Sequence, residues 1–190
     1  MIRPNRAAGE QLMYRVGTPG TYWLIGGNVA VFVLLLLGGG PLYRLLGQVG
    51  VLVLRYGFYW QLFTALFVHF DILHLGLNMV ALFYFGLMNE AIYRKPRFLT
   101  IYFSTGLLGN IASLFLLAPQ TVSGGASGAI FGIIGSYVIY QRKGQQLAGA
   151  LVYAALIFIQ SMGFGVNIFA HLFGLIGGLI LGLLLTPHGT

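Results

Sequence analysis

Long apolar stretches, separated by short polar or glycine- and proline-containing links, make up almost the whole chain. A run of about 20 apolar residues can cross the hydrocarbon core of a bilayer as a helix. Membrane-spanning helices are therefore predicted at six places: 21–39, 72–92, 97–118, 127–141, 147–162 and 167–186. The pattern predicts an all-α, polytopic membrane protein built as a six-transmembrane-helix bundle.

The link between the first two predicted spans has a character of its own. Gly40 to Asp71 is rich in Leu, Tyr and Phe but is broken by Gly and Pro. Tyr59 and Trp60 are residue types that favour the membrane–water interface. We expect this segment to lie in the membrane as a loop, whereas the links at 93–97 and 141–146 are expected to be tight polar turns.

Charge sets the expected topology. Only 7% of residues are charged, and the net charge of +7 comes from basic residues scattered between apolar runs, so no nucleic-acid-binding face is expected. One side of the predicted membrane carries Arg3, Arg6, Arg15, Arg94, Lys95, Arg97, Arg142 and Lys143, and the other carries Arg44 and Arg55. The positive-inside bias then places both termini in the cytoplasm. The expected parts are a cytoplasmic tail at 1–20, a six-span domain at 21–186 and a second tail at 187–190.

The residues that are rare or missing exclude several chemistries. There is no cysteine, so disulfides, thiolate nucleophiles and sulfur metal ligands are excluded. Asp71 is the one aspartate, and an aspartyl dyad needs two. A hydrolase of this composition would use a hydroxyl nucleophile, and no cofactor is expected. Glu90 and Arg94, at i and i+4, are expected to form an ion pair at a helix end.

Small residues recur every four positions on the fourth and sixth predicted spans. The two stripes are Gly128, Gly132 and Ser136, and Gly174, Gly178 and Gly182. Such stripes let helix backbones approach closely in lipid. Ser127 precedes one stripe and His171 shares the face of the other, and each lies 15 residues, about 22 Å, before the cytoplasmic end of its span. We expect the two side chains to meet at one level, beneath a water-filled dip.

The residue types at that level suit acyl transfer. Ser127 would begin its helix, where unpaired N–H groups and the helix dipole favour a developing oxyanion. His171 would act as its general base. His74 and Asn78 lie four residues apart on one face of the second span, and an Asn amide there is suited to stabilise the oxyanion.

Three segments resemble the motifs of a known family. GGASGAIFG is similar to the rhomboid GxSGxxxG box, HFDILHLGLN to HxxxxHxxxN, and AHLFGLIGG to AHxxGxxxG. The matching residues are Gly125, Ser127, Gly128, Gly132, His69, His74, Asn78, His171, Gly174 and Gly178. The chain is thereby identified as a member of the rhomboid family, of the minimal six-helix, prokaryotic type. It departs from many bacterial members at Gln61, where they have Arg, and at Phe131, where they have Tyr.

The resemblance implies an intramembrane serine protease. It would hydrolyse peptide bonds in or near the transmembrane segments of other proteins, by a Ser127–His171 dyad and an acyl-enzyme. His74, Asn78 and the Ser127 amide would form the oxyanion site, and Phe131 would stack on His171. The site would open to the external side of a prokaryotic plasma membrane. His69 would touch substrate or position a loop, or serve only as a structural histidine.

Three other functions are weighed against this one. A zinc site from His69, His74 and His171 is disfavoured, because the first two are about 140° apart on a helix and no carboxylate completes the set. A channel or transporter is disfavoured by the absence of an internal repeat. A catalytically inactive rhomboid-like protein that binds transmembrane clients remains the main alternative.

Overall fold

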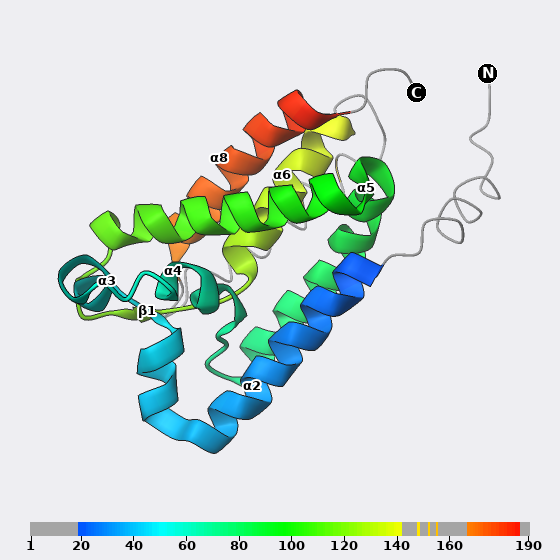
Figure 1. Cartoon of the computed structure of the whole chain (residues 1–190). Helices are drawn as coiled ribbons and strands as arrows, with labels where there is room; N and C mark the ends of the chain where they lie inside the picture. The colour runs from blue at the N-terminus through cyan, green and yellow to red at the C-terminus, as the bar shows by residue number, and fades with distance from the viewer. Residues whose placement is uncertain (1–18, 142–147, 149–151, 153–154, 156–166, 187–190) are drawn as a thin grey trace, which may run out of the picture.

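The computed structural model describes residues 19–141, 148, 152, 155 and 167–186. Four long helices dominate this part of the chain: α2 (Pro19–Leu46), α5 (Ile72–Leu116), α6 (Ser127–Tyr140) and α8 (Ile168–Leu185) (Figure 1). The predicted fifth span at 147–162, the link at 141–146 and the two tails lie almost entirely outside the described residues. The all-α membrane fold is confirmed.

Helix α5 accounts for two of the predicted spans. It has 45 residues, about 67 Å of helix, which is twice the thickness of a hydrocarbon core. The chain breaks at Arg94, whose φ of 61° and ψ of 158° are not helical, and Pro96 lies just beyond. Figure 1 shows the two arms of α5 folding back from this point, the first of them beside α2. The predicted turn at 93–97 therefore exists.

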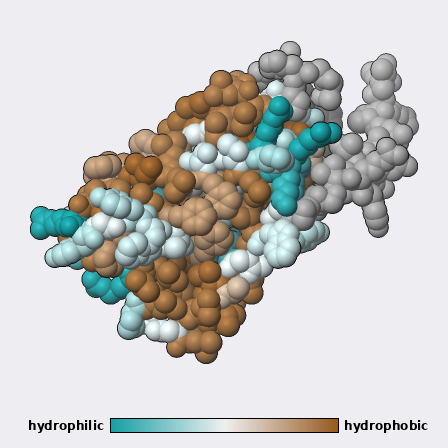
Figure 2. Space-filling model, in the orientation of Figure 1, coloured by the Kyte–Doolittle hydropathy of each residue, from teal (hydrophilic) through white to brown (hydrophobic). Residues whose placement is uncertain are grey.

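Among the described residues, three helices, α2, α5 and α8, are long and apolar enough to cross a membrane. Large apolar side chains on them face outward, with Trp23 74%, Leu37 82% and Leu184 71% exposed. Figure 2 shows this apolar surface extending across the visible face, with the most hydrophilic residues toward its ends. Such a surface is stable in lipid but not in water.

The segment between α2 and α5 is a structured loop. It contains β1 (Gln48–Val49), α3 (Gly50–Tyr56), α4 (Gln61–Thr64) and the 3₁₀ helix η1 (Ala65–Phe67). Strand β1 pairs antiparallel with β2 (Val122–Ser123) just before α6. The loop is thus bonded directly to the segment that leads into Ser127.

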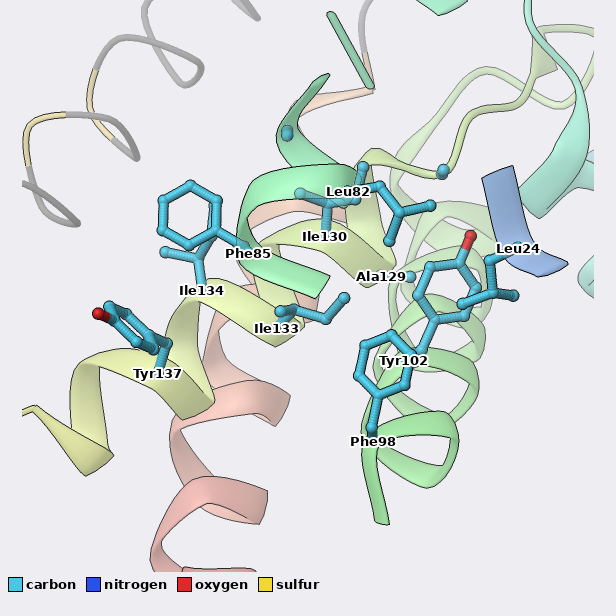
Figure 3. Packing of buried hydrophobic residues seen from close by; sticks show 12 residues of the cluster. Leu24, Leu82, Phe85, Phe98, Tyr102, Ala129, Ile130, Ile133, Ile134 and Tyr137 are labelled. Carbon is cyan, nitrogen blue, oxygen red and sulfur yellow. The ribbon is translucent and has the colours of Figure 1, made fainter. Parts of the chain in front are cut away.

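Helix α6 forms the centre of the described bundle, packed against α5 and α8. Every residue from Gly128 to Tyr137 is buried. Ile130, Ile133 and Ile134 pack with Leu82 and Phe85 of α5 in the apolar cluster that Figure 3 shows. With 14 residues, the described part of α6 is about 21 Å long and is therefore shorter than a hydrocarbon core.

The glycine stripes of α6 and α8 face each other. A methyl group on Gly174 or Gly178 would overlap the backbone carbonyl of Gly128 or Gly132. A methyl group on Gly182 would lie 2.9 Å from the Cα of Ser136. The two backbones are therefore closer than any larger residue in these stripes would permit.

The expected ion pair between Glu90 and Arg94 is wrong. Glu90 is fully buried, and its carboxylate accepts hydrogen bonds from the N–H of Gly20, at 3.0 Å, and from the N–H and hydroxyl of Thr21, both at 2.9 Å. The first N–H groups of a helix have no partner within it, so those at the start of α2 are free to bind the carboxylate, whereas Arg94 is exposed. Glu90 thus ties α2 to the first arm of α5.

Candidate active site

We call the contact between the glycine stripes of α6 and α8 the glycine seam. A hydroxyl of α6 and an imidazole of α8 meet at the end of this seam where both helices begin. Ser127 Oγ lies 2.6 Å from His171 Nε2, a hydrogen-bond distance. His171 is 2% exposed, whereas Ser127 is partly exposed. The hydroxyl is therefore the more accessible of the two groups.

Ser127 is the first residue of α6. The first N–H groups of a helix have no partner within it, and the positive end of the helix dipole lies there. Negative charge that develops on an atom bound near Ser127 would therefore be stabilised by the backbone itself.

Phe131 packs against one face of the His171 imidazole. Its ring is stacked on that of His171, with centroids 4.6 Å apart and planes 22° apart. Phe131 follows Ser127 by one helical turn, so a single helix supplies both the hydroxyl and the ring beneath the imidazole. The stack supports the ring plane without the hydroxyl of the Tyr that many family members have.

Gly125 lies where the side chains of the site converge. Its φ of 139° is in the region that favours glycine. A Cβ on this residue would lie 3.0 Å from His74 Nε2 and 3.4 Å from Ser127 Oγ. The structure thus brings His74 into the same small space as Ser127, and glycine keeps that space open.

His74 and Asn78 lie on consecutive turns of the first arm of α5. Asp71 caps this helix by accepting the His74 N–H at 2.7 Å. Asn78 is 7% exposed and donates one Nδ2 hydrogen to the His74 carbonyl at 2.8 Å. The second Nδ2 hydrogen remains available for another acceptor.

His69 is fully buried, between η1 and α5. Its Nδ1 lies 3.3 Å from the Phe67 carbonyl, and its ring centroid is 4.9 Å from that of His74. Burial, reinforced by the nearby His74, lowers the pKa of His69 to about 4. A neutral His69 packed on His74 favours a structural role over contact with substrate.

Gln61 lies at the position where many bacterial rhomboid proteins have Arg, and its side chain forms hydrogen bonds within the first loop and with the end of α2. The side chain is fully buried, donates to the Arg44 carbonyl at 2.7 Å and accepts the Val49 N–H at 2.9 Å. One neutral amide thus satisfies both a donor and an acceptor of the loop backbone.

Sequence reasoning missed one polar residue near the site. Asn167 caps α8, four residues before His171, and its amide contacts Ser113 and Ser123. An Asn directly before an apolar run is a recognised helix-start signal, but its distant partners have no sequence signature. Within the part of the chain that the structure describes, no three His, Asp or Glu side chains are grouped so that they could hold a metal ion.

Known proteins are similar to this chain in sequence. A family model described as the Rhomboid domain matches residues 56–188. Rhomboid protease GluP of Bacillus subtilis is 34% identical over 181 residues, which cover 89% of this chain but 35% of that protein. The putative rhomboid protease YdcA of B. subtilis is 36% identical over 138 residues, 67% of this chain and 68% of that protein.

A eukaryotic relative extends the match. Rhomboid-like protease 3 of Toxoplasma gondii is 36% identical over 132 residues, 64% of this chain and 50% of that protein. The chain thus spans about a third to two thirds of these relatives. Since the family model covers well over half of the sequence and the helices have the predicted membrane-spanning character, this chain is a multi-pass integral membrane protein that belongs to the rhomboid family.

Proposed function

We propose that this chain is an intramembrane serine endopeptidase that cleaves peptide bonds in or near the transmembrane segments of other membrane proteins. The observation that carries the proposal is the 2.6 Å contact between Ser127 Oγ and His171 Nε2. Membership of a family whose relatives are named rhomboid proteases supports it.

Catalysis would begin when Ser127 Oγ attacks the scissile carbonyl carbon and His171 Nε2 accepts the hydroxyl proton. His171 then donates this proton to the leaving amine as the C–N bond breaks, which leaves an acyl-enzyme on Ser127. Water, deprotonated by His171, attacks the ester, and His171 returns this proton to Ser127 Oγ as the C–O bond to the serine breaks and the second product leaves.

The oxyanion of each tetrahedral intermediate would be stabilised by three donors: the Ser127 N–H, the free Nδ2 hydrogen of Asn78 and the ring of His74. Three observations support these assignments: α6 begins at Ser127, Asn78 uses one of its two Nδ2 hydrogens within α5, and His74 lies close to Gly125. Removal of one such donor typically costs about 10² to 10³ in kcat.

The substrate would enter from the bilayer as a helix and unwind at the site. Small residues and weak helical propensity near the external membrane face are the substrate features that the family resemblance implies. The proposed orientation has both termini in the cytoplasm and the site opening outward, in a prokaryotic plasma membrane.

The test is cleavage of a transmembrane reporter by the purified full chain in vesicles. Wild type is expected to cut, and Ser127→Ala and His171→Ala are each expected to lose about a thousandfold or more of kcat. Ser104→Ala, which removes an exposed hydroxyl from α5, is the matched control and should retain full activity. Equal cleavage by wild type and Ser127→Ala would refute the proposal. A wild type that binds several reporters without cutting any would support the client-binding alternative.

A further inference from the structure

Asn167 uses its whole side-chain amide to join three segments. Its Oδ1 accepts the N–H of Ala170 at 3.0 Å, which caps α8. Its Nδ2 donates to Ser113 Oγ of α5 at 2.7 Å and to Ser123 Oγ of β2 at 2.8 Å. Ser113 and Ser123 are 2% and 7% exposed, so the serine ends of both bonds are buried.

The bond between Asn167 and Ser123 runs beside the dyad. Asn167 lies four residues before His171, and Ser123 lies four residues before Ser127. One hydrogen bond of 2.8 Å thus links the segments that lead into the two side chains, which are themselves 2.6 Å apart. A shift of α8 relative to β2 would have to break it.

The bond between Asn167 and Ser113 holds the same turn of α8 against α5. Ser113 Oγ donates in turn to the Gly109 carbonyl at 2.7 Å. A Cβ on Gly109 would lie 2.7 Å from the carbonyl oxygen of Ala170, so the backbones of α5 and α8 are in close contact there. The Asn167 amide therefore fixes the first turn of α8 from two directions.

This bridge supplies a constraint that the glycine seam lacks. Glycine stripes bring α6 and α8 together, but a glycine has no side chain with which to form a directional hydrogen bond across the contact. A displacement of about 1 Å between catalytic groups can lower a rate by about a hundredfold. The seam sets how close the helices come, and a directional contact is needed to set their register.

We propose that Asn167 is a positioning residue for the dyad: through Ser123 and Ser113 it sets the register of α8, so that His171 Nε2 meets Ser127 Oγ. The inference rests on the proposed function of Ser127 and His171. It assigns to Asn167 a role beyond that of a helix cap.

Two substitutions separate the cap from the bridge. Asn167→Ser keeps a good capping oxygen but is too short to reach Ser113 and Ser123. Asn167→Asp keeps the cap, and its second carboxylate oxygen can accept a hydrogen bond from the Ser123 hydroxyl, and one from Ser113 when that hydroxyl turns away from the Gly109 carbonyl. The reporter assay should therefore show kcat lowered about tenfold or more in Asn167→Ser, with KM within about twofold of wild type, and largely restored in Asn167→Asp.

Further variants distinguish a loss of dyad positioning from a general loss of stability. Ser123→Ala should lower kcat in the same way. Adding it to Asn167→Ser should cause little further loss of kcat, because both substitutions remove the same hydrogen bond between residues 167 and 123. Asn89→Ala removes a different buried amide, which joins α5 to α6 by donating to the Ile133 carbonyl. It should lower the melting temperature while leaving kcat near the wild-type value.

The outcomes distinguish this inference from the proposed function. Wild-type kcat in Asn167→Ser, or a loss no greater than the loss of folded protein, would overturn the positioning role while Ser127-dependent cleavage stands. Reporter cleavage that survives Ser127→Ala would overturn the proposed function and this inference with it. A selective fall in kcat, rescued by Asp, is the result that the bridge predicts.

Discussion

At the scale of single residues, the site depends on small groups placed where larger ones would not fit. Gly125 shows this most directly, since its φ of 139° favours glycine and a Cβ would lie only 3.0 Å from His74 Nε2. Gly125, the second glycine of the GGASG motif, therefore serves a steric purpose. It takes no part in the chemistry itself.

Gly125→Ala is expected to lower cleavage of the reporter sharply. The methyl group would lie 3.0 Å from His74 Nε2 and would strain the backbone, so the imidazole must move away from the site. Steady-state kinetics and thermal unfolding on the same preparation check this. Unchanged kcat in a folded variant would contradict the geometry.

His69 should make stability depend on acidity. Burial lowers its pKa to about 4, whereas the unfolded chain binds the proton near the usual value of 6.5. The contribution of neutral His69 is therefore complete above about pH 6.5 and is lost as the pH falls toward 4, by up to about 3 kcal/mol.

Thermal unfolding in detergent at about pH 7 and about pH 4.5 tests this dependence. His69→Gln, which cannot take up the proton, should lose less stability between these two values than wild type does. Parallel losses in the two proteins would show that His69 does not titrate as described.

At the scale of elements, the apolar pattern predicted the helices well. The predicted spans at 72–92 and 97–118 match the two arms of α5, and 127–141 and 167–186 match α6 and α8 to within one or two residues. Apolar periodicity is local, and so is the break at Arg94 beside Pro96. The first span was predicted to end at residue 39, but α2 bends at Gly39 and continues to Leu46.

The sequence did not predict the interactions between segments that are far apart along the chain. Strand β1 pairs with β2 across more than seventy residues, and Glu90 binds the start of α2 instead of the Arg94 one turn away. Asn167 likewise meets two serines on other elements. Each contact depends on which buried backbone or side-chain groups lack partners once the helices are packed, and local spacing does not encode that.

The α6–α8 seam should tolerate almost no added volume. Gly178→Ala places a methyl group against the Gly132 carbonyl, so the helices must separate, at a cost of about 1 to 3 kcal/mol or more. Gly26→Ala in α2 is the matched control, because nothing lies within 4 Å of its added Cβ. It should leave stability unchanged or raise it slightly.

Unfolding of the two glycine variants in detergent, followed with reporter cleavage, decides this point. Loss of activity and stability in Gly178→Ala alone is the expected result. Equal behaviour of Gly178→Ala and Gly26→Ala would mean that the seam is not a close contact in the membrane.

At the scale of the whole molecule, the charge distribution predicts an orientation. Basic residues lie within the turn at 93–97, and Arg55 belongs to α3, which Figure 1 shows at the opposite end of the bundle from that turn. A reporter that is active on one membrane side only, fused to either terminus, should indicate the cytoplasm. The same reporter inserted at Gly57, after α3, should indicate the external side, and a cytoplasmic signal there would reverse the proposed topology.

The most direct test of the central claim is to identify which residue is modified by a fluorophosphonate reagent, which phosphonylates activated serines with loss of fluoride. Peptide mass analysis of the labelled full chain should find one adduct, on Ser127, and His171→Ala should abolish it because the hydroxyl then lacks its base. A folded protein in which Ser127 stays unmodified, or is modified equally without His171, would contradict the account.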